Sequence, residues 1–403
     1  MKDDLSGKKI LVTGGTGFIG ARLVERLYRE HGVTARVLVR DLTRVPRIAR
    51  FPVEIAAGDV LDRSAVDRAT EGCDIVFHCA YGNRGPRDVR WRINVDGTRN
   101  VLNAASKAGV KRFVHVSTFS VYGHPPDGDL DERAARQFCN DDYADSKLQA
   151  EKLVFEHSKR TGLPVVVIQP TVVYGPYAPS WTTSVINRLK SGRVILLNGG
   201  DGLCNAVYID DVVNALLLAA SEEKAVGEAF LISAEEPITW KTFYEHFEAM
   251  VGGSRTVVMT TSEAIAHAKQ VKGLQTLPRQ LISFMRGNPR LLSLVLGSPE
   301  ATKLSTLVPP AMRRLARRTA KGLVARGRSS LVPVMSSATL PIHPLSPWAI
   351  RRFESKVRVR VDKANRLLGY KPTVTFETGI NLTEQWARWA NLLDHDDSPK
   401  TVP

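Results

Sequence analysis

The stretch Lys8-Lys9-Ile10-Leu11-Val12-Thr13-Gly14-Gly15-Thr16-Gly17-Phe18-Ile19-Gly20 decides the fold of this chain. Its first half is a short apolar strand and its second half is a glycine-rich turn. Residues 21–28 then place apolar side chains at helical spacing. Strand, glycine turn and helix form the context in which a backbone approaches a dinucleotide pyrophosphate at a helix N-terminus. We therefore expect dinucleotide contacts from Gly14, Thr16, Gly17, Phe18, Ile19 and Gly20.

A second strand over residues 35–39 ends at Arg40, and Asp41 follows directly. In a dinucleotide-binding fold this strand end lies beside the adenosine ribose. There an acidic residue accepts a hydrogen bond from a free 2′-hydroxyl, whereas an arginine pairs with a 2′-phosphate. Arg40 therefore favours NADP as the cofactor. NAD is the alternative, because Asp41 could still reach the ribose. The structural alternative is that Arg40 is a solvated loop charge.

Further strands are predicted over residues 53–56, 73–80 and 111–116, and a helix is predicted to open at Asn94 and run to about residue 108. Strands that alternate with helices predict an α/β fold of the Rossmann type. This is a doubly wound parallel sheet with its ligand sites at the carboxyl ends of the strands.

Several residues at these strand ends are candidates for cofactor contacts. Asp59 can accept from an adenine amino group, and Val60 can pack on the adenine ring. The strand over residues 73–80 should end beside the nicotinamide-side ribose, where Cys79, Ala80 and Tyr81 stand. His78 is interpreted as a hydrogen-bonded core histidine rather than a catalytic base.

The segment Tyr143-Ala144-Asp145-Ser146-Lys147 is the candidate chemical centre. Two residues four apart share one face of a helix. A phenol with a pKa near about 10 becomes a better base at neutral pH when an ammonium lies close to it. The pair could exchange a proton with an alcohol or carbonyl while a nicotinamide exchanges a hydride. Because this spacing also arises by chance on helix surfaces, the interpretation depends on the surrounding motifs.

Composition places the chain among soluble globular proteins, with 43% hydrophobic and 24% charged residues over 403 positions. The four cysteines show no CxxC pair, so we expect reduced thiols in a cytoplasmic protein and no metal site. The amino terminus does not resemble a secretory signal, and no credible membrane-spanning segment is found. The net charge of +15 is concentrated between Arg255 and Arg360.

Taken together, the motifs resemble the extended short-chain dehydrogenases/reductases. This superfamily includes the NAD-dependent epimerase/dehydratase and hydroxysteroid dehydrogenase-like families. The resemblance covers about the first 250 residues and resumes at residues 363–372. The matching stretches are Gly14–Gly20, Asp59-Val60, Asn94–Thr98, Ser117–Gly123, Tyr143–Lys147, Gln169–Pro176 and Val207–Val213.

The resemblance implies a role for each matching residue. Tyr143 is the implied general acid/base, and Lys147 is implied to bind the nicotinamide ribose and lower the pKa of the tyrosine. Thr118 is implied to bind the substrate oxygen, with Ser117 in reserve. Asn94 is expected to belong with the catalytic residues, although its commoner role in the family is to support the site. Further contacts are expected from Pro170 and Val173 with the cofactor, and from Ser120 with the substrate.

Two departures from the motifs of nucleotide-sugar enzymes reduce the range of reactions that we expect. Nucleotide-sugar dehydratases of the family carry an Asp-Glu pair after the catalytic threonine, whereas this chain has Phe119-Ser120. The asparagine and arginine that hold a sugar diphosphate are replaced by Val172 and by Cys204-Asn205. The pattern therefore resembles the ketone and alcohol oxidoreductases of the superfamily more than its nucleotide-sugar enzymes.

The predicted organisation has four parts: a dinucleotide-binding domain (1–177), a substrate lobe (178–261 and 348–395), a basic, partly apolar helical insertion (262–347) and a tail (396–403). Trp181, Phe243 and Tyr244 are candidates to line an apolar pocket, with core packing favoured for each.

In the insertion, residues 312–326 place cations on one helix face and apolar residues on the other. Such a helix suits an anionic membrane surface, and a lid or oligomer contact is the favoured alternative. Nucleic-acid binding is not expected, because the insertion contains one aromatic residue, Phe284.

The leading hypothesis is an NAD(P)-dependent oxidoreductase that acts on a secondary alcohol or ketone of a fairly hydrophobic substrate. The first alternative is a nucleotide-sugar epimerase with tightly bound NAD. The second is a membrane-associated dinucleotide-binding protein without turnover. The resemblance also implies a homodimer that pairs the helices containing Asn94 and Tyr143.

Overall fold

The computed structural model describes residues 5–275 and 340–393. Contacts divide the chain into two compact units, residues 1–261 with 341–403, and residues 262–340. Of the second unit the structure describes one helix, α8 (Thr261–Gln275), which begins at the boundary. The apolar tract after residue 275, the basic stretch 312–326 and the tail 396–403 lie outside the described residues.

The first unit is built on a seven-stranded sheet whose pairings are all parallel, in the order β12-β7-β5-β4-β1-β2-β3. The strands are β1 (Ile10–Thr13), β2 (Ala35–Val39), β3 (Val53–Ala57), β4 (Ile75–His78), β5 (Arg112–Val116), β7 (Val165–Pro170) and β12 (Ala229–Ile232). Strand order reverses between β1 and β4, which is where a doubly wound sheet opens a crevice for ligands. The predicted Rossmann-type sheet is confirmed, with two strands beyond the predicted five.

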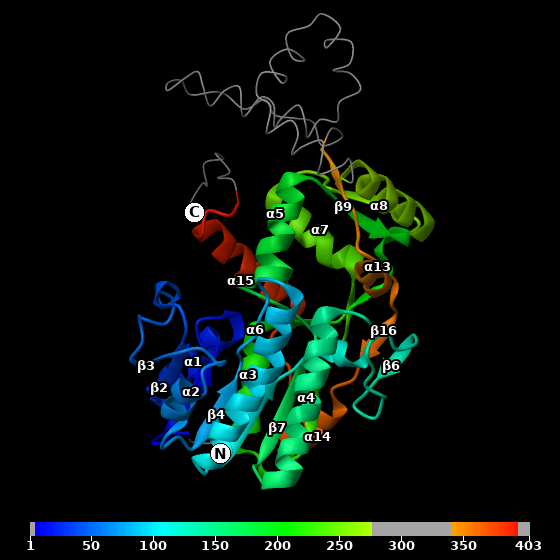
Figure 1. The fold of residues 1–403 in the computed structure, drawn as a ribbon. Coiled ribbons are helices and arrows are strands. Elements are labelled where there is room, and N and C mark those ends of the chain that lie inside the picture. The colour runs from blue at the N-terminus through cyan, green and yellow to red at the C-terminus, as the bar shows by residue number, and fades with distance from the viewer. Residues whose placement is uncertain (1–4, 276–339, 394–403) are drawn as a thin grey trace, which may run out of the picture. The chain divides into compact units, whose positions relative to one another are not determined.

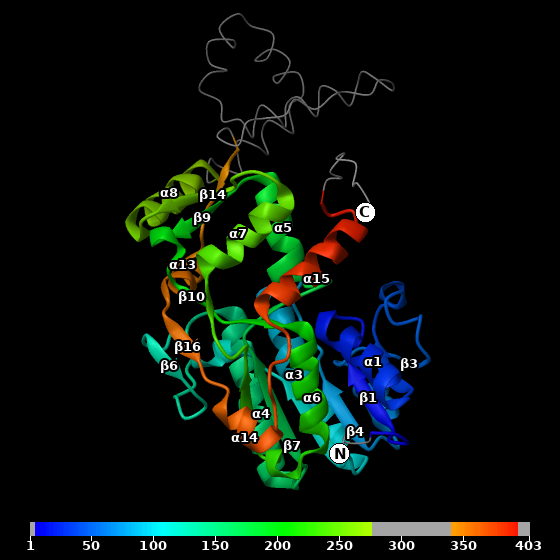
Figure 2. The same cartoon turned by 180° about the vertical axis from the view of Figure 1, so that it is seen from behind.

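Helices cover both faces of this sheet (Figures 1 and 2). On one face lie α2 (Arg63–Thr70), α3 (Arg87–Lys107) and α4 (Asp142–Thr161), and on the other lie α1 (Phe18–His31) and α6 (Ile209–Ser221). Every residue of the central strands β1, β5 and β7 is buried, which is why their sequences are mostly apolar. Asp210, at the start of α6, joins that helix to α1 through a 2.6 Å contact with Arg22 Nε.

The helix predicted to open at Asn94 begins seven residues earlier, at Arg87, so this prediction was wrong. Pro86 stands at the N-cap position, where its fixed φ and missing N–H suit a helix start. Gly97 therefore lies inside the helix. A Cβ there would come within 2.7 Å of the Val60 side chain, so glycine lets α3 approach the end of β3.

Above the carboxyl ends of the strands lies a smaller lobe (Figure 1). Its helical elements are η3 (Pro179–Thr183), α5 (Ser184–Ser191), α7 (Trp240–Val251), α13 (Pro347–Glu354) and α15 (Phe376–Trp389). Its strands form short sheets: β14 (Thr256–Met259), β9 (Arg193–Leu197) and β15 (Ile342–His343); β8 (Val172–Tyr174) with β11 (Ala206–Tyr208); β10 (Leu203–Cys204) with β13 (Ile238–Thr239); and β6 (Gly128–Leu130) with β16 (Val357–Val359). One further helix, α14 (Asp362–Leu368), packs against β12.

Chain segments far apart in sequence meet in this lobe. β15 and α13 follow residue 340, yet β15 pairs with β9, about 150 residues earlier in the chain. Phe243 and Tyr244 are buried in an aromatic cluster around Trp240 and Phe353, as core packing predicts. The segment after residue 340 is thus built into the lobe and carries α13 toward the sheet.

Candidate active site

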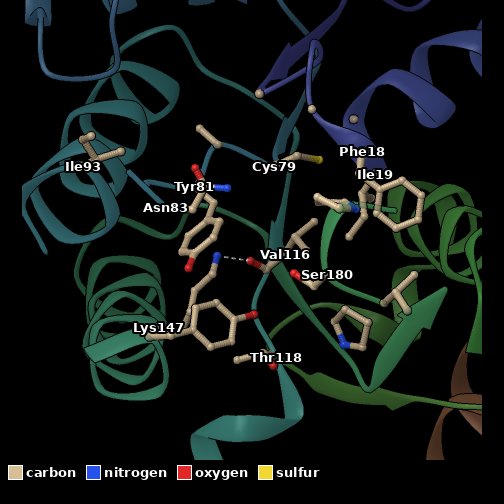
Figure 3. Close-up of a pocket in the computed structure, with 18 of the residues that line it drawn as sticks. Phe18, Ile19, Cys79, Tyr81, Asn83, Ile93, Val116, Thr118, Lys147 and Ser180 are labelled. Atoms are coloured by element: carbon tan, nitrogen blue, oxygen red, sulfur yellow. Dashed lines mark hydrogen bonds between the residues drawn. The ribbon is translucent and has the colours of Figure 1, made fainter. Parts of the chain in front are cut away.

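A cleft of about 660 Å³ opens at the carboxyl ends of the central strands (Figure 3). Its walls include every residue that the sequence predicts to contact cofactor or substrate: Gly14, Thr16, Gly17, Phe18, Ile19, Gly20, Arg40, Asp59, Val60, Cys79, Ala80, Tyr81, Thr118, Ser120, Tyr143, Lys147, Pro170 and Val173. Of the predicted site residues, Asn94 lies outside this lining and is buried. The parallel topology brings these strand ends to one edge of the sheet.

The glycine turn after β1 has the geometry of a dinucleotide cradle. Gly14 has φ +70°, and a Cβ there would lie 2.6 Å from the backbone nitrogen of Ala80. A Cβ at Gly20 would lie 2.4 Å from the Gly14 carbonyl oxygen. The N-cap of α1 is Gly17, which has no capping side chain, and the first turn contains no acid. The N–H groups of this helix end therefore remain available to an anion, and the residues present fit a pyrophosphate.

The end of β2, where a ribose contact is expected, carries paired charges. Arg40 Nη1 lies 3.3 Å from the Asp59 carboxylate, and both residues line the cleft. Asp41 accepts hydrogen bonds from the backbone N–H and hydroxyl of Thr43, at 3.0 and 2.6 Å. Its carboxylate is thus used to cap the following turn. Arg44 adds a second cation to the cleft wall.

Lys147 lies on α4 and reaches across to β5 (Figure 3). Its Nζ donates a 2.7 Å hydrogen bond to the carbonyl oxygen of Val116, and the ammonium lies 5.6 Å from the Tyr81 ring centroid. Burial lowers the pKa of Lys147 to about 8, against the raising influence of Cys79 and Glu151. An ammonium has three donors, so two remain for a ligand in the cleft.

Tyr143 lies one helical turn before Lys147, and Thr118 lines the same cleft. Burial raises the pKa of Tyr143, while the Thr118 side chain and the charge of Arg352 act to lower it. The resemblance implies Lys147 as the cation that lowers this pKa, yet the cation that acts on the phenol here is Arg352. The net effect is a protonated phenol at neutral pH, which is a proton donor.

The two adjacent hydroxyls after β5 have different partners. Ser117 Oγ donates to the buried Glu151 carboxylate at 2.6 Å, and Glu151 also accepts from Gln169 Nε2 and pairs with Arg136. The Ser117 hydroxyl is therefore committed to the core. Thr118 caps a short 3-10 turn, η2 (Phe119–Tyr122), and lines the cleft. Its position favours Thr118 over Ser117 as the hydroxyl that meets a substrate.

Asn94 connects α3 to the loop after β4 and to α4. Its Oδ1 accepts from the Gly82 backbone N–H at 2.8 Å, and its Nδ2 donates to Ser146 Oγ at 3.0 Å. Both ends of the amide are satisfied inside the protein. His78 is likewise satisfied: its ring nitrogens lie 2.7 Å from Thr13 Oγ1 and 2.9 Å from Thr98 Oγ1, and burial lowers its pKa to about 3. The interpretation of His78 as a core histidine is confirmed.

Residues that the upper lobe contributes to the cleft wall include Trp181 from η3, and Trp348 and Arg352 from α13. Trp181 does both things that the sequence allows: it packs on Trp240 and Phe243 of the aromatic cluster, and it lines the cleft with its ring centroid 5.9 Å from the Arg352 guanidinium. Sequence reasoning did not identify Trp348 or Arg352 as site residues. They follow the second unit in a stretch without a motif, and only the return of α13 to the sheet places them here.

The structure also bears on membrane and metal binding. In residues 5–275 and 340–393, no helix combines the length and apolarity needed to cross a membrane. Within the same ranges, no group of three or more His, Cys, Asp or Glu side chains is arranged to hold a metal ion.

Fold and cleft together define a nucleotide-binding α/β protein of the extended short-chain dehydrogenase/reductase class. The family model described as "NAD dependent epimerase/dehydratase family" matches residues 10–233. The chain belongs to this family. The resemblance identified from the motifs is thereby confirmed.

Curated relatives are dehydrogenases and reductases. The chain is 32% identical over 244 residues to a 2-alkyl-3-oxoalkanoate reductase of Shewanella oneidensis, covering 57% of this chain and 62% of the relative. It is 28% identical to a 3beta-hydroxysteroid-dehydrogenase/decarboxylase of Arabidopsis thaliana, covering 60% of this chain and 47% of the relative. The match thus spans less than two thirds of the length of either relative. A 2-alkyl-3-oxoalkanoate reductase of Stenotrophomonas maltophilia is 33% identical, with 61% of this chain and 77% of the relative covered.

Solved structures share the fold. An epimerase of Methanothermobacter thermautotrophicus superposes with a TM-score of 0.66 at 19% identity, covering 96% of this chain and 94% of the other. A UDP-glucose 4-epimerase of Thermotoga maritima gives 0.64 at 20% identity, covering 95% and 99%. At this identity the likeness establishes the architecture alone.

Proposed function

We propose that the protein is an NAD(P)-dependent oxidoreductase that interconverts a secondary alcohol and a ketone on a fairly hydrophobic substrate. The observation that carries this proposal is that Tyr143, Thr118 and Lys147 line the same cleft, with Tyr143 and Lys147 one helical turn apart on α4. Relatives named as reductases and 3-hydroxysteroid dehydrogenases support it.

A bound nicotinamide dinucleotide would supply or accept the hydride at the substrate carbon. In reduction, Tyr143 gives its hydroxyl proton to the substrate oxygen, and in oxidation it takes that proton back. Thr118 holds the same oxygen in place. Lys147, fixed by the Val116 carbonyl, has two N–H donors for ribose hydroxyls, and the charge of Arg352 acts on the phenol.

We propose NADP as the preferred cofactor. Arg40 and Arg44 line the ribose end of the cleft, and Asp41 is engaged with Thr43. A 2′-phosphate would meet two guanidinium groups there, whereas a free 2′-hydroxyl would lack an uncommitted carboxylate at Asp41. Asp59 already pairs with Arg40, which orients that guanidinium toward the cleft wall.

Replacing Tyr143 by Phe tests the activity. The Tyr143→Phe protein should bind NADPH with unchanged affinity, while turnover of ketones falls by about two to four orders of magnitude. Unchanged turnover would refute the role of Tyr143. Purified protein that carries stoichiometric NAD and consumes no external cofactor would instead support the epimerase alternative.

Two proposals about partners rest on the sequence. The first is contact of residues 262–347 with an anionic membrane surface, and equal sedimentation with anionic liposomes before and after deletion of this region would end it. The second is a homodimer through α3 and α4. A monomeric mass in solution at micromolar concentration would contradict it.

A further inference from the structure

Arg352 of α13 projects into the catalytic part of the cleft. Its Nη2 donates a 2.9 Å hydrogen bond to Ser120 Oγ, and its charge acts on Tyr143. The guanidinium lies 4.0 Å from the ring centroid of Trp348 and 4.6 Å from that of Phe119. An arginine stacked between aromatic rings is held in one orientation, with its remaining N–H groups directed along its plane.

Arg352 differs from two arginines that follow it in the chain, because it has no carboxylate partner among the described residues. Arg358 pairs with Glu236, and Arg360 pairs with Asp362 at 2.9 Å. Among the ion pairs found in the described ranges, none involves Arg352. Burial lowers the pKa of Arg352 to about 10, so the group is cationic at neutral pH. A partly buried cation without a counter-charge is costly unless an anion joins it.

The geometry points to Arg352 as the residue that binds a carboxylate of the substrate close to the reacting carbon, so that the substrate class is 3-oxo and 3-hydroxy acids with an apolar chain. This inference rests on the proposed oxidoreductase function and makes its substrate specific.

The spacing of Thr118, Ser120 and Arg352 suits a substrate whose carboxylate lies close to its ketone. Thr118 Oγ1 lies 3.4 Å from Ser120 Oγ, which in turn accepts from Arg352. The guanidinium is therefore one serine hydroxyl away from the group that holds the substrate oxygen. In a 3-oxo acid a single carbon separates the ketone from the carboxylate, which matches this short span. Trp181 and Trp348 then provide apolar surface for the chain.

The charge of the site fits one carboxylate better than a diphosphate. Cys204 stands where nucleotide-sugar enzymes of the family carry an arginine, and burial raises the pKa of its thiol well above the usual value. This thiol is neutral at physiological pH. An anion at Arg352 thus meets a single guanidinium supported by a serine hydroxyl.

A pair of substrates that differ only in charge tests the inference. Oxidation of a long-chain 3-hydroxy acid and of its methyl ester is followed by the absorbance of the reduced nicotinamide. The native protein should prefer the acid, and Arg352→Met should lower kcat/KM for the acid by about 10- to 100-fold while the ester changes only a few-fold. Arg351→Met is the matched control, because the neighbouring Arg351 is exposed on the same helix, and it should leave the preference unchanged.

Each other outcome has a definite meaning. Equal losses on acid and ester would show that Arg352 acts through Tyr143 or through folding, and would overturn the inference. A native preference for the ester would overturn it while leaving the oxidoreductase function intact. If neither compound turns over, calorimetric titration of the NADPH-loaded protein with the acid decides. If the acid binds, and if Arg352→Met abolishes this binding while Arg352→Lys partly retains it, the anion subsite is supported without the proposed reaction. If the acid does not bind, both the anion subsite and the proposed reaction on such acids are refuted.

Discussion

The ammonium of Lys147 donates a 2.7 Å hydrogen bond to the carbonyl oxygen of Val116, the last residue of β5. This contact fixes a residue of α4 to the end of a central strand. It also satisfies one donor of a side chain that is 5% exposed. The lysine is thus held beside Tyr143 by the sheet itself.

Burial of Lys147 makes the stability of the protein depend on pH. The folded protein releases the Lys147 proton near pH 8, whereas the unfolded chain keeps it until about 10.5. Between these values the unfolded state binds more protons, so the stability of the native protein rises with pH. Relative to the Lys147→Met variant, the free energy of unfolding should rise by up to roughly 3 kcal/mol across this window. Urea denaturation of both proteins at about pH 7 and about pH 10 measures this, and a constant difference would contradict it.

Replacing Arg40 by Gln should separate the two cofactors. The variant removes the cation without placing a second carboxylate beside Asp59. The dissociation constant for NADPH should increase by about 10- to 100-fold, because a charge-assisted contact to phosphate is lost, while that for NADH stays unchanged. Fluorescence titration measures both constants. Arg68→Gln, an exposed change on α2 away from the cleft, is the control, and equal effects on both cofactors would refute the 2′-phosphate role.

Gly20→Ala should abolish dinucleotide binding. The new methyl group would lie 2.4 Å from the Gly14 carbonyl oxygen, so the turn must open, at a cost of about 1–3 kcal/mol in folding free energy. Gly32→Ala at the other end of α1 is the matched control. Gly32 has φ +65° with open space around it, so alanine there is strained without disturbing the turn. If both variants keep NADPH affinity, the turn does not hold the cofactor.

Asn94 is expected to support the site rather than to react. Asn94→Ala leaves the Gly82 N–H and the Ser146 hydroxyl without their partner, which should cost about 1–3 kcal/mol of stability. Turnover per folded molecule should fall less than in Tyr143→Phe. A double-mutant cycle with Ser146→Ala, followed by denaturation, measures the coupling of the pair. Full stability with turnover as low as that of Tyr143→Phe would assign Asn94 to the chemistry instead.

Most of the sheet and half of the cleft could be predicted because their signals are local. The glycines after β1 and the Tyr143–Lys147 spacing constrain the backbone within a few residues, and a parallel sheet then brings the strand ends together. The start of α3 was misplaced because Asn94 begins a motif rather than a helix. The helix start is set by Pro86, eight residues before the motif begins.

The amino-acid sequence by itself determined the dinucleotide cradle, the doubly wound parallel sheet and the candidate reacting groups, since each follows from local motifs. Tertiary structure decided what surrounds the candidate reacting groups. Arg352 and Trp348 are more than 200 residues from Tyr143, and the pairing of β15 with β9 and the packing of α13 on β9 and β10 bring them into the cleft wall. A side chain's electrostatic partners depend on distance in space, which no spacing along the chain encodes. The cation that acts on Tyr143 is therefore Arg352, and folding alone selected it.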